Sequence, residues 1–354
     1  MRTSDFDYQL PPERIAQTPI EPRDAARLMV LHRDTGEIEH RIFRDLVEYL
    51  KPADLLVAND SRVIPARLFA RKVPTGGRVE LLLLLRRAER TWEALVKGRK
   101  VVPGTRLELM PARGPEAKDE EPVAEPIAAD VLEITPSGGR LIRFDQPLTP
   151  QLEKLGETPL PPYIHEPLDD SERYQTVYAR VQGSAAAPTA GLHFTSELID
   201  QIRALGVEFA FVTLHIGLDT FRPMQTERIE DHKMHSEYAV LPPETAEAIN
   251  RTRQAGGRVI AIGTTVVRVL ETAAQRVVPH SELRGFSGWT DLFIYPGYQF
   301  QVVDALITNF HLPRSTLLVL VSAFAGRDLI FKAYHIAMEQ NYRFYSFGDA
   351  MFIV

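Results

Sequence analysis

The sequence predicts an α/β fold, a mainly parallel sheet flanked by helices, with an inserted small antiparallel β-barrel domain. In the second half of the chain, short apolar segments alternate with segments of helical spacing, which is typical of a parallel sheet with helices on its faces. Residues 63–150 differ, because short β-rich runs follow one another there with glycine and proline turns and no convincing helix. An apolar strand at residues 55–58 precedes these runs, so the α/β pattern lies on both sides of them.

Chain length and this change of pattern set the expected domain boundaries. A chain of 354 residues is longer than one compact core usually accommodates. We expect one α/β domain made of residues 1–62 and 151–354, with the barrel domain at residues 63–150 between its two parts. Residues 111–129 hold four Pro, five Ala and four Glu, a composition that favours a mobile acidic Pro/Ala loop inside the insert.

Capping residues mark the helix boundaries in the second half. Thr195 or Ser196 can cap a helix that Gly206 ends, and Pro243 lies in the first turn of the next helix. The predicted helices cover residues 195–205, 243–255, 264–274, 315–325 and 328–340. The predicted strands cover residues 55–58, 209–215, 258–262, 290–295, 303–309 and 344–354 of the α/β domain, and 78–85, 92–96, 132–135 and 141–144 of the insert.

The composition excludes several kinds of site. The chain has no cysteine, which excludes disulfides, thiolate zinc sites, iron–sulfur clusters and cysteine nucleophiles. No stretch approaches the roughly 18 to 20 apolar residues that a membrane helix needs, and the first residues lack the apolar region of a signal peptide. We therefore expect a cytoplasmic protein with no membrane partner. The sequence has no coiled-coil pattern, so we expect a monomer with no stable protein partner.

Charge is distributed unevenly along the chain. The net charge is −6, yet residues 62–106 hold twelve basic and three acidic residues, a local charge of +9. Such a block is consistent with contacts to the phosphates of a nucleic acid. It is equally consistent with solvated strand faces that bind nothing, and both interpretations stay open.

Several predicted strands end in small or polar residues. Residues 263–265 (Gly-Thr-Thr) form a turn into a helix, whose free N–H groups can bind a carboxylate or phosphate or can simply be capped. Residues 216–217 and 309–311 follow two other strands. Because ligands of parallel sheets bind at the carboxyl ends of the strands, these residues indicate one polar cleft.

Two further segments carry polar side chains beside predicted strands or helices. Residues 188–195 form a turn of small residues with His193, which can let a ligand approach the backbone or can pack against the sheet. Asn59, Asp60 and Arg62 follow the first strand, where they can orient a polar substrate or form an Asx turn with a surface ion pair.

Histidines and acids cluster at residues 231–237. His232 and His235 are three residues apart, and Glu237, His215 or His311 could complete a metal site with them. The spacing differs from the His-Glu-x-x-His of zinc proteases. We therefore prefer a hydrogen-bonding or proton-transfer role and keep a metal site as the alternative.

Eight segments are long or unusual enough to compare with a known family. They are residues 4–11, 57–67, 173–178, 187–195, 212–217, 263–268, 308–313 and 342–351. In the same order and over nearly the whole chain, they resemble the S-adenosylmethionine:tRNA ribosyltransferase-isomerase family. The resemblance weakens across the insert. It departs from the family pattern at Ala26 and at Asp219, where only the local turn is in doubt.

The resemblance implies an activity, two substrates and a fold. S-adenosylmethionine would serve as a ribosyl donor and not as a methyl donor. The acceptor would be the 7-aminomethyl-7-deazaguanine wobble base of a tRNA, and the products would be epoxyqueuosine-tRNA, adenine and methionine. The family is not known to need a metal, and its fold is an α/β domain with an inserted β-barrel.

The implied reaction needs a general base, a site for the donor and cationic contacts to tRNA. The candidate catalytic residues are His193, His215, His235, Glu237 and Asp60. The candidate substrate-binding residues are Arg62, Arg67, Thr189, Gly191, Gly263, Thr264, Thr265, Arg268, Asn309 and His311. The candidate tRNA-binding residues are Arg86, Arg87, Lys97, Arg99 and Lys100. We expect the donor to lie over the strand ends and the tRNA to extend to the insert.

Three other functions compete on the residues alone. A metal-dependent hydrolase would use His232, His235 and Glu237. An S-adenosylmethionine-dependent RNA methyltransferase would release S-adenosylhomocysteine in place of adenine and methionine. A non-catalytic RNA-binding protein would release none of these products.

Overall fold

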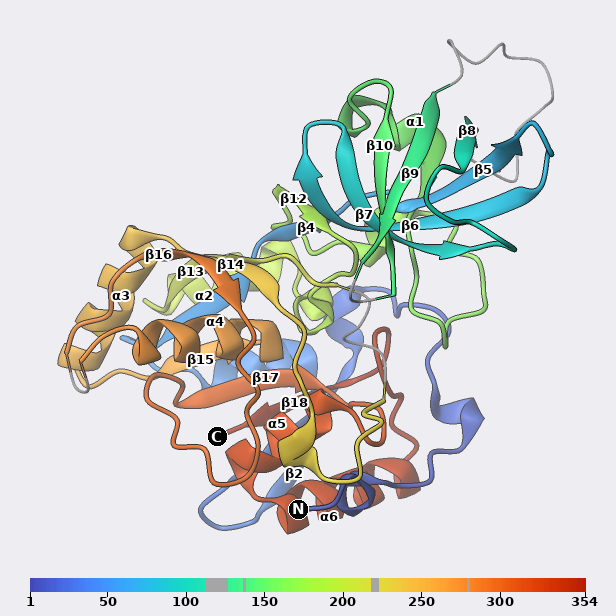
Figure 1. The fold of residues 1–354 in the computed structure, drawn as a ribbon. Helices are drawn as coiled ribbons and strands as arrows, with labels where there is room; N and C mark the ends of the chain where they lie inside the picture. The colour runs from blue at the N-terminus through green and yellow to red at the C-terminus, as the bar shows by residue number, and fades with distance from the viewer. Residues whose placement is uncertain (112–126, 136–137, 218–222, 279–280) are drawn as a thin grey trace. The chain divides into compact units, whose positions relative to one another are not determined.

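The computed structural model describes residues 1–111, 127–135, 138–217, 223–278 and 281–354 (Figure 1). The chain divides into two compact units. The first, which we call the sheet unit, consists of Met1–Arg62, Pro161–Val181 and Ala187–Val354. The second, which we call the barrel unit, consists of Val63–Leu160 and Gln182–Ala186.

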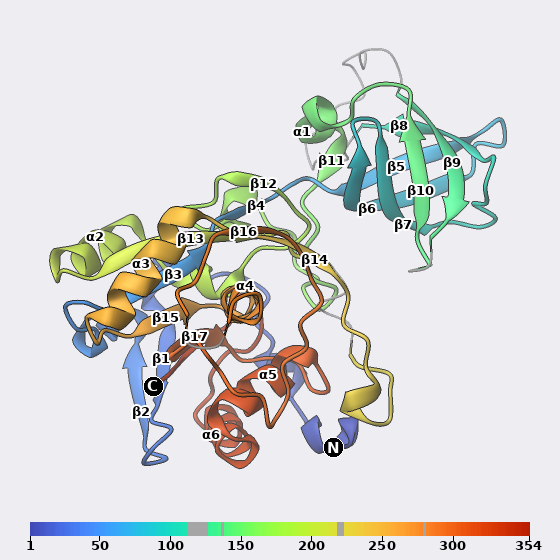
Figure 2. The ribbon, with the colours of Figure 1, turned by 60° about the vertical axis from the view of Figure 1, so that its left-hand side comes forward.

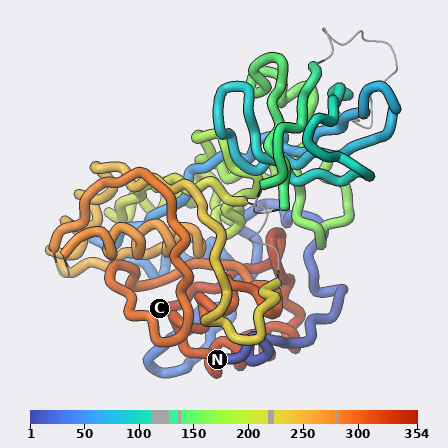
Figure 3. Tube along the Cα trace, viewed as in Figure 1, coloured from blue at the N-terminus to red at the C-terminus, as the bar shows by residue number. Residues whose placement is uncertain are grey.

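The sheet unit is built on a nine-stranded mixed sheet within the described residues. Its strands are, in spatial order, β16 (Phe286–Thr290), β14 (Glu237–Leu241), β13 (Glu208–Leu214), β3 (Leu55–Asn59), β15 (Val259–Ile262), β17 (Ala305–Asn309), β18 (Ala350–Ile353), β1 (Arg27–Leu31) and β2 (Ile38–Ile42). The centre is parallel, because β3 pairs in parallel with β13 and β15, and β15 with β17. The edges are antiparallel. The parallel pair β1–β18 joins opposite ends of the chain, drawn blue and red in Figure 3.

Helices cover the sheet because their apolar stripes face it. The helices are α2 (Ser196–Ala204), α3 (Pro243–Gln254), α4 (Thr264–Gln275), α5 (Thr316–Ala325) and α6 (Arg327–Glu339). Side chains of α2 join the 3-10 helices η4 (Phe43–Tyr49) and η7 (Thr189–His193) in one core cluster with β1, β3, β15, β17 and β18. Figure 2 shows α4, α5 and α6 grouped together. Shorter 3-10 helices are η1 (Thr3–Phe6), η2 (Pro12–Arg14), η3 (Arg23–Ala25), η6 (Ser171–Tyr174) and η9 (Ile229–Asp231).

The barrel unit contains an antiparallel sheet that closes on itself. In order, its strands are β5 (Arg67–Val73), β6 (Arg78–Ala88), β7 (Thr91–Lys97), β10 (Arg140–Phe144), β9 (Ala128–Ile134) and β8 (Arg106–Met110). Pairing of β5 with β8 closes the ring, which removes free strand edges. Alternate residues such as Leu68, Ala70 and Leu81 point into its apolar core. Outside the ring, β11 (Gly156–Glu157) also pairs with β5.

Four short elements complete the described part of the chain. The 3-10 helix η5 (Thr149–Gln151) leads into α1 (Leu152–Leu155), whose two leucines join the barrel core. Strands β4 (Ser61–Val63) and β12 (Val181–Ser184) form a two-stranded sheet. The expected insert ended at residue 150, whereas the barrel unit runs on to Leu160 because α1 and β11 pack with it.

The predicted fold class is confirmed, and the five predicted helices are present within one or two residues of their expected ends. Capping was predicted correctly at α2, where the Thr195 hydroxyl accepts a hydrogen bond from the Leu198 N–H at 3.1 Å. The 111–129 loop falls mostly on residues 112–126, outside the described residues, while Ala128 and Ala129 belong to β9.

Three predicted strands are wrong in extent. In the barrel unit, the strand expected at 132–135 is β9, which begins at Ala128. The strand expected at 290–295 is instead β16, which ends at Thr290. The chain leaves the ladder there, because the carbonyls of Thr290 and Leu292 accept hydrogen bonds from the guanidinium of Arg268. The strand expected at 344–354 begins only at Ala350, since a turn precedes it in which the Gly348 N–H bonds to the Tyr345 carbonyl at 3.0 Å.

No helix in the described part of the chain is long and apolar enough to cross a membrane.

Candidate active site

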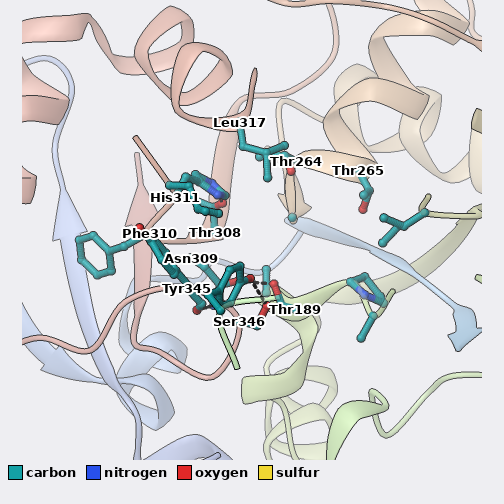
Figure 4. A pocket seen from close by; sticks show the side chains of 17 residues that line it. Thr189, Thr264, Thr265, Thr308, Asn309, Phe310, His311, Leu317, Tyr345 and Ser346 are labelled. Carbon is teal, nitrogen blue, oxygen red and sulfur yellow. Dashed lines mark hydrogen bonds between the residues drawn. The ribbon is translucent and has the colours of Figure 1, made fainter. Parts of the chain in front are cut away.

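A pocket lies at the carboxyl ends of the central strands of the sheet unit (Figure 4). Its space, open solvent included, is about 540 Å³. The lining residues are Tyr163, Ala187, Pro188, Thr189, Ala190, Ile216, Gly263, Thr264, Thr265, Thr308, Asn309, Phe310, His311, Leu312, Leu317, Tyr345 and Ser346. The strand ends that the sequence predicts to converge, at 216, 263 and 309–311, all contribute to this wall.

The start of α4 forms one wall of the pocket. Gly263 precedes the helix with φ of +92°, a conformation that favours glycine. Its N–H donates to the Ile307 carbonyl at 2.8 Å, which fastens the turn to β17. The first N–H groups of an α-helix have no partner within the helix, so this end can receive an anion. The hydroxyls of Thr264 and Thr265 lie beside it.

Asn309, at the end of β17, hydrogen-bonds to two other segments of the pocket wall, at Tyr345 and at Thr189. It is buried, its Nδ2 donates to the Tyr345 carbonyl at 3.1 Å, and its Oδ1 accepts from the Thr189 hydroxyl at 3.0 Å. Tyr345 has φ of +70°, which costs a side chain other than glycine roughly 1–3 kcal/mol. The Asn309 amide thus helps hold a strained tyrosine in the pocket wall, and its role is to position that wall.

Asn59, at the end of β3, also has a positioning role. Its side chain is fully buried, and its Oδ1 accepts hydrogen bonds from the N–H groups of Ser61 and Leu214, both at 3.1 Å. Its Nδ2 donates to the Leu214 carbonyl at 3.0 Å and to the Thr265 hydroxyl at 3.4 Å. Asn59 therefore ties β3, β13 and the start of α4 together, and it does not line the pocket itself.

His311 is the pocket's histidine. Its Nε2 and the Thr308 hydroxyl are 2.8 Å apart. Its main chain is fixed as well, because its N–H donates to the Tyr334 hydroxyl at 2.8 Å and its carbonyl accepts from Tyr8 at 2.5 Å. Burial lowers the pKa of His311 to about 3, so the ring is neutral near pH 7.

Asp60 and His215 lie close to the pocket wall without lining it. Asp60 is buried, accepts a hydrogen bond from the Thr213 hydroxyl at 2.6 Å and pairs with Arg180 at 2.7 Å. Burial lowers the pKa of His215, and the nearby Asp60 charge opposes this. The His215 Nδ1 is buried and has no hydrogen-bond partner among the residues that the structure describes.

Glu237 sits in a buried charge pair. One carboxylate oxygen pairs with Arg268, and the other accepts from the Gly217 N–H at 2.9 Å and lies 3.2 Å from His235 Nε2. Burial alone would raise the pKa of Glu237, but the charge of Arg268 and the hydrogen bond from His235 hold it at about 2. A carboxylate this acidic is a weak base, which disfavours Glu237 as the general base.

Arg268 is engaged in the same way. It is the fifth residue of α4 and is buried facing Glu237, and its remaining nitrogens donate to the carbonyls of Leu292 and Thr290 at 3.1 and 3.2 Å. The structure therefore gives this candidate substrate-binding residue a partner inside the protein and does not place it in the pocket wall.

His193 and Gly191 lie behind the pocket wall. The two ring nitrogens of His193 face the carbonyls of Ala190 at 3.1 Å and Gly348 at 2.9 Å, and the ring stacks on Phe43. No ring nitrogen is left for a substrate, so His193 fits a positioning role better than that of a base. A Cβ on Gly191 would lie 2.1 Å from the Tyr178 hydroxyl. Packing against Tyr178, and not a ligand, explains this glycine.

The two predicted substrate-binding arginines at the junction with the insert do not line the pocket either. Arg62 pairs with Glu172 in the sheet unit. Arg67 belongs to β5 of the barrel unit, where its Nε lies 3.4 Å from the Glu80 carboxylate.

The predicted tRNA-binding residues are all exposed on the barrel unit. Arg86 and Arg87 lie at the end of β6, and Lys97 ends β7. Arg87 pairs with Glu93 at 2.6 Å, while Lys97 is 88% exposed and only loosely paired with Glu80 at 3.8 Å. Arg99 and Lys100 follow in the next turn. Exposed cations of this kind remain available to phosphates.

The predicted metal alternative finds no support. Among the described residues, no group of three His, Cys, Asp or Glu side chains is arranged to hold a metal ion. The ring of His232 packs edge-on against Phe293, and both oxygens of Glu237 are already engaged.

Sequence reasoning missed several residues of the pocket wall. Tyr345, Ser346, Thr308 and Leu317 line it, although none was a candidate. Tyr163 also lines the pocket, and its hydroxyl lies 2.7 Å from that of Ser346. The one available signal was that residues 308–313 and 342–351 belong to the segments that carry the family resemblance.

Fold and pocket together define an α/β protein with a pocket at the strand ends and an inserted β-barrel. Residues 3–353 match the model of a family described as queuosine biosynthesis protein. The chain is 56% identical to the S-adenosylmethionine:tRNA ribosyltransferase-isomerase of Symbiobacterium thermophilum and 54% identical to that of Moorella thermoacetica, each match covering 100% of both chains. The chain belongs to this family.

A solved structure agrees with this assignment. The crystal structure of S-adenosylmethionine tRNA ribosyltransferase from Thermotoga maritima is 44% identical, with a TM-score of 0.56, and the match covers 99% of this chain and 100% of that one.

Proposed function

We propose that this chain is an S-adenosylmethionine:tRNA ribosyltransferase-isomerase. It transfers the ribosyl group of S-adenosylmethionine to the 7-aminomethyl-7-deazaguanine wobble base of tRNA and isomerises it, giving epoxyqueuosine-tRNA, adenine and methionine. The observation that carries this conclusion is the full-length match to relatives of that name at 56% and 54% identity.

The pocket geometry supports a site for S-adenosylmethionine in the sheet unit. The lining combines apolar side chains with hydroxyls and amides, which suits a nucleoside. The N-terminal end of α4 at Thr264 and Thr265 suits the methionine carboxylate. Asn309 and Thr189 hold this wall in place through their mutual hydrogen bond.

For the general base, the geometry favours His215. Its buried Nδ1 has no partner among the described residues, its neighbour Ile216 lines the pocket, and its lowered pKa keeps the ring neutral, the form that accepts a proton. Asp60 nearby would stabilise the imidazolium that then forms. His235 remains a second candidate, with His193 and Glu237 in positioning roles.

We further propose that the exposed cations Arg86, Arg87, Lys97, Arg99 and Lys100 bind tRNA phosphates. The enzyme would act in the cytoplasm as a monomer and without a metal. The methyltransferase and hydrolase alternatives have no support from the named relatives.

One assay tests donor, acceptor and reaction type together. Purified protein is mixed with S-adenosylmethionine and tRNA bearing the 7-aminomethyl-7-deazaguanine base, and the small molecules are separated by chromatography. We expect adenine and methionine in equal amounts, and neither with tRNA that carries unmodified guanine. Release of S-adenosylhomocysteine instead would identify a methyltransferase and contradict the proposal.

A further inference from the structure

The walls of the pocket carry no formal charge. Of the described residues that line it, none is Asp, Glu, Lys or Arg. Its titratable residues are His311, Tyr163 and Tyr345, and burial shifts the pKa of each toward the neutral form. Burying an unpaired charge is costly, so these walls suit the uncharged part of a ligand.

His311 gives the pocket one fixed polar contact. Thr308 engages Nε2 at 2.8 Å, and two tyrosine hydroxyls hold the main chain of His311. The residue is 7% exposed. No residue in the described part of the chain hydrogen-bonds to its Nδ1. A buried ring with one nitrogen anchored and the other free can read the polar edge of a flat heterocycle.

Apolar and aromatic side chains supply the faces that such a heterocycle needs. Figure 4 shows His311, Thr264 and Leu317 along one side of the pocket, and Thr189, Tyr345 and Ser346 along the other. The Tyr345 ring packs against Tyr163 with centroids 4.8 Å apart. The hydrogen bond from Asn309 to the Tyr345 carbonyl keeps this residue at its positive φ.

We infer that this pocket is the adenine subsite, in which His311 Nδ1 contacts the polar edge of the purine and Tyr345 forms part of the wall against its face. The inference rests on the proposed use of S-adenosylmethionine. Of that molecule, the purine and ribose are uncharged, whereas the sulfonium, ammonium and carboxylate are not. The charged end therefore lies away from His311 and Tyr345, at the start of α4, where free N–H groups can receive the carboxylate.

The test measures the binding of adenine itself by calorimetry, alone and in competition with S-adenosylmethionine. We expect adenine to bind, to compete with S-adenosylmethionine, and to bind more tightly than hypoxanthine, whose edge carries an oxygen in place of the amino group. We expect methionine alone not to displace adenine. Adenine that binds without competing with S-adenosylmethionine would overturn the inference.

Two matched variants isolate the His311 contact. His311→Asn keeps a polar atom near the Nδ1 position, whereas His311→Gln keeps one near Nε2. We expect adenine affinity to fall about tenfold in His311→Gln and clearly less in His311→Asn, as the loss of one buried hydrogen bond implies. His335→Asn, which changes an exposed histidine of α6, is the control and should leave affinity unchanged. Equal losses in both His311 variants, at unchanged unfolding midpoints, would overturn the inference.

The pH profile gives a second readout. Because His311 stays neutral, we expect adenine affinity to be flat between about pH 6 and pH 9. A step near the ordinary histidine value of about 6.5 would contradict a neutral contact. Failure of this inference is distinguishable from failure of the proposed function. If only the inference fails, adenine and methionine are still released from S-adenosylmethionine. If the proposed function fails, they are not released, whether or not adenine binds to the pocket.

Discussion

The pocket of the sheet unit and the basic surface of the barrel unit use polar residues in opposite ways. Two residues of the pocket wall, Asn309 and His311, are buried and hydrogen-bonded to other parts of the protein, and so is Asn59 behind the wall. These hydrogen bonds fix the positions of the three side chains. On the barrel, side chains such as Lys97 are exposed and loosely paired. The difference teaches that buried, hydrogen-bonded polar groups define a fixed shape, whereas exposed and loosely paired cations stay free to attract distant charges.

The largest effect should come from breaking the buried pair behind the pocket. Glu237→Ala leaves Arg268 as an uncompensated buried charge, so we expect the free energy of unfolding to fall by about 3–5 kcal/mol. Chemical denaturation measures this loss. A barrel pair with neither partner buried gives the control: Arg106→Ala, which removes the ion pair to Asp130, should cost no more than about 1 kcal/mol. Similar losses in the two variants would remove the contrast between the regions.

Acid should destabilise the pocket region through His311. Its pKa is about 3 in the folded protein, below the ordinary value of 6.5. Between these two pH values the unfolded chain is protonated at His311 and the folded chain is not. Stability should therefore fall by a few kcal/mol as the pH drops from about 6.5 toward 3. His311→Asn should make this part of the pH dependence shallower in urea titrations. An unchanged slope would mean that His311 titrates normally in the folded protein.

Removing four barrel cations should weaken tRNA binding without touching the pocket. For Arg86, Arg87, Lys97 and Lys100 changed together to Ala, we expect tRNA affinity at low salt to fall at least about tenfold. The slope of log affinity against log salt should shrink by roughly 0.7–0.9 for each lost phosphate contact. Filter binding over a salt series measures both. The control changes four exposed cations of the sheet unit, Arg203, Arg251, Arg253 and Lys332, and an equal loss there would locate the tRNA site elsewhere.

A smaller effect should follow from releasing the strained tyrosine. Asn309→Ala removes the hydrogen bonds to Tyr345 and Thr189, so we expect turnover to fall about tenfold with the overall fold retained. Asn309→Asp keeps the acceptor for Thr189 but places a buried carboxylate oxygen against the Tyr345 carbonyl, so it should lower turnover at least as much as Asn309→Ala. Steady-state kinetics of the wild type and both variants, with separate kcat and KM values for S-adenosylmethionine, measure this effect. Full activity in both variants would show that the wall needs no such support.

The smallest effect is expected at Arg62. Its exposed pair with Glu172 should contribute less than about 1 kcal/mol, so Arg62→Ala should unfold at nearly the wild-type denaturant concentration. A large loss of stability would mean that this residue belongs with the buried network and not with the surface pairs.

The sequence predicted those features that depend on neighbouring residues. The Thr195 cap, the Pro243 start and the convergence of the strand ends at 216, 263 and 309 follow from local signals and from the geometry of parallel strands. The family resemblance supplied the reaction, which no local signal could.

Features that depend on distant contacts were not predictable in this way. Arg268 looks like a ligand contact from its place in the first turns of α4, yet it turns to Glu237, which is 31 residues earlier in the chain. Nothing local to Tyr345 indicates a positive φ, because the stabilising amide comes from Asn309. The same holds for His193, which the sequence offered as a general base. One of its ring nitrogens faces the carbonyl of Gly348, which is 155 residues away in the chain.

The division of the chain has a consequence for its genetics. The barrel unit is not encoded in one stretch, because Gln182–Ala186 returns to it after the chain has left at Leu160, and the Ser184 carbonyl accepts a hydrogen bond from the Ile64 N–H at 2.9 Å. A single in-frame deletion of Val63–Leu160 would leave the segment Gln182–Ala186 without the residues it contacts. Exchange of barrels between related genes therefore requires two matched pieces to move together, which makes the module difficult to acquire or lose by one recombination event.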